Sequence, residues 1–442
     1  MTDRQQQVAL AAQAFVYGYP LVAGLDEIAG FVGGTTHLGI SAPYNTFAHA
    51  RRLAGPEMDF VTPNNDTCYS IAMCDVRPGP ILLRVPDTGG RYYVLQFVDA
   101  WTNNFAYVGR RATGTAAGTF LLAPRDYDGP LPEGATVVRA PTGVFAIVGR
   151  VQVDGEADLP AVHALQDRLT LEPLGAAEPA GVPAPDPRVT GDLAWWERMR
   201  VSLLAFPPPA ADGPFLEACA ALGLTRAASP FPDMAPEQAA VLVEGAAAGR
   251  ARIEELMQDV AATPEGWQSA AHVFDYNLDH FEVGTRDEPA WTIADRATAY
   301  ATRAVAARAG LWGNHGYEAD YALIWVDADG EPLRGDRRYE LRLEADPPVD
   351  AFWSLTMYDT PGFRLVANPI GRYSIGDRTP GIVRDPGGGL TVRMQAGPPG
   401  PGLEANWLPA PPGPFRPVLR MYQPRAEVLD GTYVLPAIRR VG

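Results

Sequence analysis

The stretch RYYVLQFVDAW, residues 91–101, carries the clearest structural pattern in the sequence. It is rich in aromatic and β-branched residues, which favour strands. Successive side chains of a strand point to opposite faces. Two faces are therefore expected, one with Tyr92, Val94, Gln96 and Val98 and the other with Tyr93, Leu95, Phe97 and Asp99. The pattern predicts a strand inside a β domain.

Working outward, strand patterns extend over roughly residues 60–155 and return from 317 to the end. The part between them is different: the apolar spacing predicts helices over 192–206, 214–222, 235–262 and 292–309. A further helix is expected over 4–17, ended by Pro20 because proline disfavours a helix interior.

This order predicts an α+β, mainly β fold with two antiparallel β-sandwich or jelly-roll-like domains bridged by a helical segment. The expected divisions are 1–172 (a helix plus a β domain), 173–191 (a linker rich in Pro, Ala and Gly), 192–310 (the helical bridge) and 311–442 (a second β domain).

The composition excludes several classes of protein. All 36 basic residues are Arg, so lysine Schiff-base chemistry and a Walker-type phosphate loop are both excluded. A net charge of −16 without a basic stripe argues against nucleic acid as a partner and against an anionic membrane. Three Cys without a C-x-x-C pair, and no visible signal peptide, lead us to expect a cytoplasmic protein.

No recognised cofactor motif is present. None of the six His residues has the spacing of a zinc site, so no metal is expected. No G-x-G-x-x-G follows a strand and no G-x-S-x-G occurs, which removes the usual signals for nicotinamide or flavin binding and for an α/β-hydrolase. We therefore expect no cofactor.

Several strings resemble two families of proteins of unknown function. NTFAHARRL (45–53), VTPNNDTCYS (61–70), VPDTGGRYYVLQFVDAWTNNFAYVGRRATG (85–114) and GPLPEGATVVRAPT (129–142) resemble DUF1254. AFWSLTMYDTPGFRLVANPIGRYSIGD (351–377), NWLPAPPGPFRPVLRMYQP (406–424) and VLDGTYVLP (428–436) resemble its usual companion, DUF1214. The resemblance implies two mostly β domains bridged by helices.

The string TPNNDTCYS (62–70) is the leading candidate site. His49, Asp66 and Tyr69 are the candidate catalytic residues, because His passes protons near neutral pH and Asp orients it or acts as a base. Asn64, Asn65 and Thr67 are the candidate groups for binding the substrate or stabilising an oxyanion. The alternative is an Asx-turn in which Asp66 caps backbone amides and Tyr69 begins a strand.

Two further groups of residues are candidate ligand contacts. After the strand at 91–101, Trp101 and Asn103 could bind a polyol, while Arg91 could clamp a carboxylate or pair with Asp87. The alternative there is a strand core followed by a polar turn. In the second β domain the candidates are Asn368, Arg372, Asn406 and Trp407; the alternative for N-W-L-P-A-P is a rigid crossing that packs its Trp.

Together these observations favour a cofactor-independent enzyme, a hydrolase or lyase, that acts on a small oxygenated molecule by general acid–base chemistry. The alternative is a β-sandwich protein without catalysis that binds carbohydrate or another small molecule, or that forms homo-oligomers through its aromatic surfaces.

Overall fold

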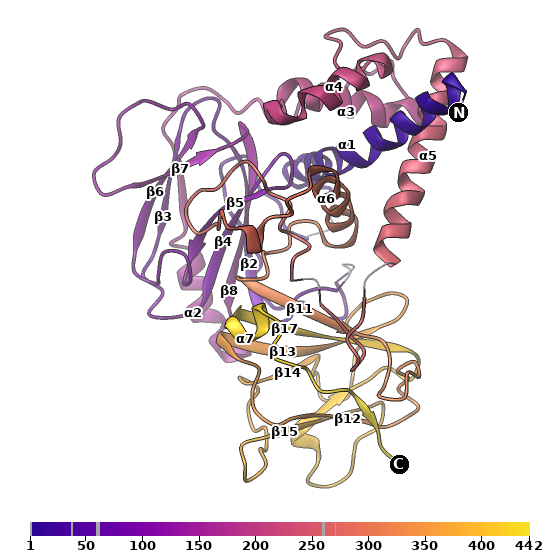
Figure 1. Cartoon of the computed structure of the whole chain (residues 1–442). Coiled ribbons are helices and arrows are strands. Elements are labelled where there is room, and N and C mark those ends of the chain that lie inside the picture. The colour runs from indigo at the N-terminus through magenta and orange to yellow at the C-terminus, as the bar shows by residue number, and fades with distance from the viewer. Residues whose placement is uncertain (1, 37–38, 59–61, 259–260, 270) are drawn as a thin grey trace.

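The computed structural model describes residues 2–36, 39–58, 62–258, 261–269 and 271–442. Its first β domain consists of two sheets packed face to face (Figure 1). The larger sheet has the order β1 (Ala48–His49), β2 (Thr67–Asp75), β8 (Val144–Gln152), β4 (Tyr93–Asp99), β5 (Asn104–Gly109). The smaller has the order β7 (Thr136–Ala140), β6 (Gly118–Pro124), β3 (Ile81–Val85), β9 (Thr170–Pro173).

The second β domain has the same plan and lies below the first in Figure 1. Its larger sheet has the order β10 (Trp267–Ser269), β11 (Ala319–Ile324), β17 (Phe415–Pro424), β13 (Val349–Asp359), β14 (Ser374–Gly376). Its smaller sheet has the order β16 (Trp407–Pro409), β15 (Leu390–Gln395), β12 (Tyr339–Leu343), β18 (Arg439–Arg440). Alternate side chains of both sheets fill one apolar core between them.

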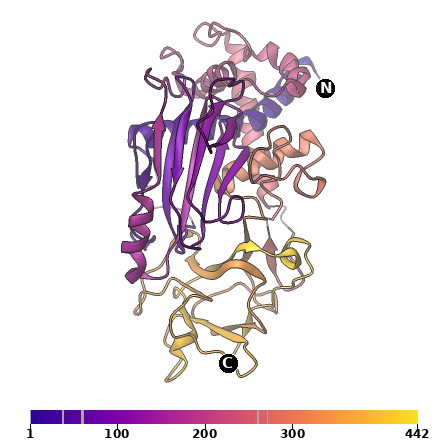
Figure 2. The same ribbon diagram turned by 90° about the vertical axis from the view of Figure 1, so that its left-hand side faces the viewer.

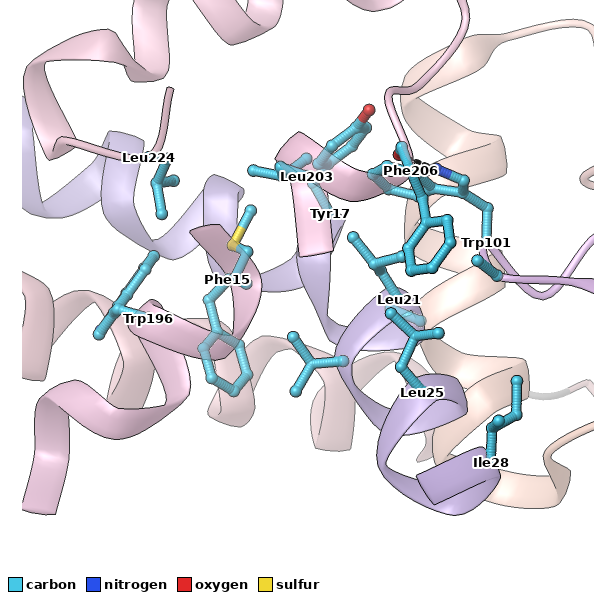
Figure 3. Close-up of a cluster of buried hydrophobic side chains, with 14 of the residues drawn as sticks. Phe15, Tyr17, Leu21, Leu25, Ile28, Trp101, Trp196, Leu203, Phe206 and Leu224 are labelled. Atoms are coloured by element: carbon cyan, nitrogen blue, oxygen red, sulfur yellow. Dashed lines mark hydrogen bonds between the residues drawn. The ribbon is translucent and has the colours of Figure 1, made fainter. Parts of the chain in front are cut away.

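Helices join and cover the two domains. They are α1 (Asp3–Gly33), α2 (Leu159–Gln166), α3 (Ala194–Ala205), α4 (Gly213–Cys219), α5 (Pro236–Gln258), α6 (Arg296–Gly310) and α7 (Ala426–Leu429). Helix α1 packs against α3, α5 and α6 and against the outer face of the first domain's larger sheet. Figure 3 shows this apolar cluster, with Phe15, Leu21 and Leu25 of α1 beside Trp196 and Phe206.

The prediction that Pro20 ends the first helix is wrong. Helix α1 continues through Pro20 to Gly33. A proline inside a helix removes one hydrogen bond and costs roughly 3 kcal/mol. Burial of residues on several sides of α1, Pro20 among them, offsets that penalty.

By length and composition α1 could cross a membrane, but 56% of its apolar window is buried inside the protein. Of the helix expected over 235–262, residues 259 and 260 lie outside the described part of the chain.

The predicted α+β class with two β domains joined by helices is confirmed. The strand at 91–101 also has the expected faces: Tyr93, Leu95 and Phe97 point into the sandwich, whereas Tyr92 and Val98 point outward. The sheets are not purely antiparallel, however, because β6 pairs with β7, and β15 with β16, in parallel.

The outer face of the first domain's larger sheet changes from apolar to polar side chains about halfway along its strands. Near one end, Met73, Val98 and Ala146 are buried under the helices. Toward the other end, the same face carries Gln96 and Arg150 and turns toward the second domain. Figure 2 shows the strands of the first domain standing above the second. The polar half of this face therefore lies where the two domains meet.

Candidate functional site

The turn before β2 is built by Asn64. Its Oδ1 accepts the backbone N–H of Asp66 (2.6 Å), and its Nδ2 donates to the Thr67 hydroxyl (2.9 Å). The same Nδ2 also donates to the Tyr422 hydroxyl of the second domain (3.0 Å). An Asx-turn is thus present, as the alternative interpretation expected, but Asn64 caps it and Asp66 does not. The carboxylate of Asp66 is left for side-chain partners.

Asp66 is 3% exposed and faces the second β domain. Its Oδ2 accepts hydrogen bonds from the hydroxyls of Ser354 (2.6 Å) and Tyr422 (3.1 Å). Its Oδ1 accepts no hydrogen bond from any described residue, and Nη2 of Arg378 lies 3.9 Å from it. A buried carboxylate normally has its oxygens satisfied. Here one oxygen remains available to a ligand.

A pocket of about 260 Å³ opens beside this oxygen, between the two domains. The first domain contributes Asn65, Asp66 and residues 153–155, and the second contributes Ser354, the segment 371–374 and Arg378. Arg378 is fixed by hydrogen bonds to the Val153 carbonyl and to Asp154 Oδ1, both 2.8 Å long. The pocket therefore presents a carboxylate, a hydroxyl and a guanidinium to whatever enters it.

A pair of arginines, Arg416 and Arg420, holds the segment that leads into this turn. Arg420 donates to the Thr62 carbonyl (3.2 Å) and to the Tyr358 hydroxyl (2.7 Å), and Arg416 donates to the Thr62 hydroxyl (2.7 Å). Thr62 has a φ of 54°, an unfavourable value for a β-branched residue. Strain of this kind persists only when the surroundings impose it, and it is common at functional sites.

The predicted convergence of His49, Asp66 and Tyr69 is not found. His49 pairs in register with Ser70, and its Nδ1 lies 2.9 Å from the Ser70 hydroxyl. Ser70 follows Asp66 by four residues along an extended strand, a separation of roughly 13 Å. Burial lowers the pKa of His49 to about 4, so its ring is neutral at physiological pH. It belongs to the strand edge and not to the pocket.

Tyr69 lies on the opposite face of the sheet from His49, because adjacent residues of a strand point in opposite directions. Its ring packs beneath Arg150, whose guanidinium carbon is 5.5 Å from the ring centre. Tyr69 is thus close to the domain interface but does not line the pocket at Asp66.

The candidates after the strand at 91–101 are engaged in the fold. Arg91 binds Asp158 through both terminal nitrogens (2.5 and 2.7 Å), so neither the carboxylate clamp nor the pairing with Asp87 is found. Trp101 is 3% exposed and donates to the Phe206 carbonyl (3.0 Å). Asn103 lies between Asp99 and Arg303. A polar turn with a buried core explains these contacts.

Of the candidate ligand contacts in the second domain, three serve the fold and one lines the pocket. Asn368 stabilises its own turn, and Asn406 makes paired hydrogen bonds with the backbone of Val383. Trp407 is 2% exposed and donates to the Gln395 carbonyl, so it packs as the alternative expected. Arg372 does line the pocket, with its Nη1 donating to three backbone carbonyls, and so does the candidate Asn65 of the first domain.

Sequence reasoning missed the pocket residues Ser354 and Arg378 and the Asp66 partner Tyr422. A signal for one of them, Ser354, was present. Polar side chains alternate at Ser354, Thr356 and Tyr358 between the apolar residues Trp353, Leu355 and Met357, which indicates a polar face. Nothing local indicates that this face meets Asp66.

Another interdomain carboxyl, that of Glu318, is separate from the pocket. It is 3% exposed and accepts a hydrogen bond from the Tyr92 hydroxyl (2.9 Å). Burial raises its pKa from 4.5 to about 7, although Tyr92 and the nearby positive charges of Arg111 and Arg150 oppose the shift.

A second pocket, of about 300 Å³, lies at the edge of the first domain beside Tyr44, Asp75 and Gly79. Both oxygens of Asp75 are already occupied there, by Arg77 and by the backbone N–H of Gly181. Glu178 also lines this pocket but is exposed to solvent, so among the described lining residues no buried carboxylate has a free oxygen like that of Asp66.

Comparison with known proteins agrees with this architecture. The chain matches the model of DUF1254, a protein of unknown function, over residues 44–173, and that of DUF1214, also of unknown function, over residues 318–426. A search of curated proteins gave no match.

Solved structures extend the comparison to almost the whole chain. The chain is similar to the VPA0106 protein from Vibrio parahaemolyticus, with 26% identity, a TM-score of 0.74 and coverage of 99% of this chain and 100% of the other. An uncharacterised protein from Burkholderia cenocepacia matches with 12% identity, a TM-score of 0.46 and coverage of 99% and 94%. The chain is a member of the DUF1254/DUF1214 domain-containing proteins, a family of unknown function.

Proposed function

We propose that the chain is an enzyme, a hydrolase or lyase, that acts by general acid–base chemistry on a small oxygenated molecule held in the interdomain pocket. The observation that carries this proposal is the carboxylate of Asp66 in the wall of the pocket, whose Oδ1 accepts no hydrogen bond from a described residue and has only the longer ion pair with Arg378. A buried carboxylate with one free oxygen is suited to accept a proton from a substrate or from a water molecule.

The surrounding groups suit distinct roles in such a reaction. The hydroxyls of Ser354 and Tyr422 hold Oδ2, which fixes the direction of Oδ1 toward the pocket. Arg378 is near enough to stabilise negative charge that develops on a substrate oxygen. Both domains supply essential groups, so the site is complete only when they are docked.

The proposal assigns no catalytic role to His49, because its ring is at the strand edge beside Ser70. In this respect the proposed mechanism differs from the one expected from the sequence alone, in which His49 was a catalytic residue. It also supplies a control, because a substitution at His49 changes an ionisable group of the same region without touching the pocket.

The test is a turnover screen with esters, lactones and glycosides, using the wild-type protein, Asp66→Asn and His49→Gln. Asp66→Asn keeps the shape of the side chain but cannot accept a proton as a base, so kcat should fall by about 10²–10⁴-fold. His49→Gln should stay within a factor of about 3 of the wild type, as expected for a residue outside the reaction.

Equal activity of Asp66→Asn and the wild type would contradict the proposal. Tight binding of a compound in the pocket without turnover would instead favour the alternative of a small-molecule-binding protein.

A further inference from the structure

Arg150 is a buried cation with no carboxylate in salt-bridge contact; the charge of Glu318 acts on it only from a longer distance. It lies on β8, on the face that turns toward the second domain, and is 6% exposed. Within the described part of the chain, no Asp or Glu oxygen lies within salt-bridge distance of its guanidinium, although 21 pairs between an arginine and a carboxylate are found among the described residues. An unpaired buried charge is unfavourable by several kcal/mol in general. Its retention needs a physical reason.

Neutral acceptors occupy only part of the guanidinium. Nη1 donates to Gln96 Oε1 (2.8 Å) and to Asn314 Oδ1 (3.3 Å), and Nη2 donates to the Trp312 carbonyl (3.2 Å). A guanidinium has five N–H donors, so two remain. One of them is on Nε, which donates to no described residue. The Nε edge of a guanidinium is one of those that bind a carboxylate through two parallel hydrogen bonds.

The buried Arg303 gives a direct comparison, because it is also 6% exposed and also packs on tyrosine rings. Its Nε is sealed from solvent without a partner, and both tyrosine hydroxyls are used, that of Tyr276 by the Thr102 carbonyl and that of Tyr300 by Asp212. The Nε of Arg150 is not among the sealed atoms. The Nε of Arg150 is therefore accessible, whereas that of Arg303 is not.

The tyrosines beside Arg150 keep their hydrogen-bonding capacity. Tyr69 is only partly buried, and its hydroxyl bonds to no described residue. Tyr321 is also partly buried, and its hydroxyl receives only a long contact of 3.5 Å from Asn314. Two hydroxyls with unused hydrogen-bonding capacity therefore belong to residues that neighbour Arg150, Tyr69 directly and Tyr321 through Asn314.

The loop that accepts hydrogen bonds from Arg150 contains a residue with strained backbone geometry, Trp312. Trp312, whose carbonyl accepts from Nη2, has a φ of 63°. The next carbonyl, that of Gly313, accepts from both Gln96 and Asn104 (2.7 and 2.9 Å), which keeps the loop in this conformation. An aromatic residue at positive φ is unfavourable and persists where the surroundings require it. The loop therefore fixes Arg150 in one orientation.

We propose that Arg150, Tyr69 and Tyr321 form a binding site for a small carboxylate, with Arg150 as its counter-charge. The carboxylate accepts from Nε and Nη2 of Arg150 and from the Tyr69 hydroxyl. Tyr69 follows Asp66 by three residues of extended chain, roughly 10 Å, so this site is separate from the Asp66 pocket and goes beyond the proposed function.

The test is calorimetric titration with acetate, succinate and benzoate, each matched by its neutral amide. The wild type should bind at least one carboxylate and bind its amide at least 10-fold more weakly. Arg150→Gln should lose at least 10-fold in affinity. Tyr69→Phe, which leaves the buried charge in place and so tests the site even if Arg150→Gln does not fold, should lose about 2- to 10-fold, as expected for one hydrogen bond.

Two controls separate this inference from the proposed function. Arg372→Gln removes a guanidinium that also bonds only to neutral groups, but at the other pocket, and should leave carboxylate binding unchanged. Asp66→Asn should lower turnover without weakening carboxylate binding. Failure of every carboxylate to bind, or equal affinity in Tyr69→Phe and the wild type, would overturn the site at Arg150 and leave the role of Asp66 untouched.

Discussion

The hydrogen bond between Asp66 and Ser354 should couple the two β domains energetically. The residues are 288 positions apart, both are 3% exposed, and their oxygens are 2.6 Å from each other. A hydrogen bond to a charged group contributes about 1.5–3 kcal/mol, and burial here limits screening by solvent. We therefore expect an interaction energy of about 1.5–3 kcal/mol between Asp66→Asn and Ser354→Ala, because the cycle cancels the contacts of Asp66 with Tyr422 and Arg378, which are lost with and without Ser354.

The assay is a double-mutant cycle from urea unfolding of the wild type, the two single variants and the double variant. Unfolding is followed by far-UV circular dichroism and tryptophan fluorescence together, because a chain with two domains can unfold in more than one step. The matched control is the neutral hydrogen bond from Ser374 to Asn65 (3.3 Å) in the same pocket, for which about 0.5–1 kcal/mol is expected.

An interaction energy below about 0.5 kcal/mol for Asp66 and Ser354 would refute the reasoning, because it is the value typical of residues that share no contact. It would mean that the carboxylate is satisfied by solvent and that the domains are not held together through it.

Three further predictions concern stability and reactivity. The raised pKa of Glu318 means that the folded protein keeps a proton which the unfolded chain releases between pH 4.5 and about 7. The free energy of unfolding should therefore fall by up to about 3 kcal/mol as pH rises through this interval. Urea unfolding at pH 5 and at pH 8 measures this difference, and Glu318→Gln should abolish it. Gly245→Ala should lower the free energy of unfolding by about 1–3 kcal/mol, because the new methyl meets Ala11 of α1. Gly310→Ala, with open space around it, should be neutral or stabilising by up to about 1 kcal/mol in the same assay. Burial raises the pKa of the Cys68 thiol to about 11, and Cys74 and Cys219 are buried as well. Ellman's reagent should therefore react with all three thiols only after unfolding. Rapid labelling of the folded protein would contradict this.

Much of the fold could be predicted from the sequence because it rests on local patterns. The alternation in RYYVLQFVDAW marked a real strand, and the region between the β domains had helical spacing. The error at Pro20 has a physical cause: the packing around α1 outweighs the local penalty of proline, and that packing depends on distant helices.

The site was only half predictable for a related reason. Asn64 and Asp66 stand out because a dense polar turn is visible in nine residues. Their partners Ser354 and Tyr422 come from strands of the other domain. Contacts between segments so far apart cannot be predicted from local patterns in a single sequence. His49 was included because it is close in sequence, but the strand pairing places it beside Ser70 instead.

The most direct test of the central claim is a crystal structure of the protein soaked with a set of small esters, lactones and hydroxy acids. We expect a bound molecule within hydrogen-bond distance of Asp66 Oδ1, between Ser354 and Arg378. Ligands found only elsewhere, for example in the pocket beside Asp75, with nothing but water at Asp66, would contradict it.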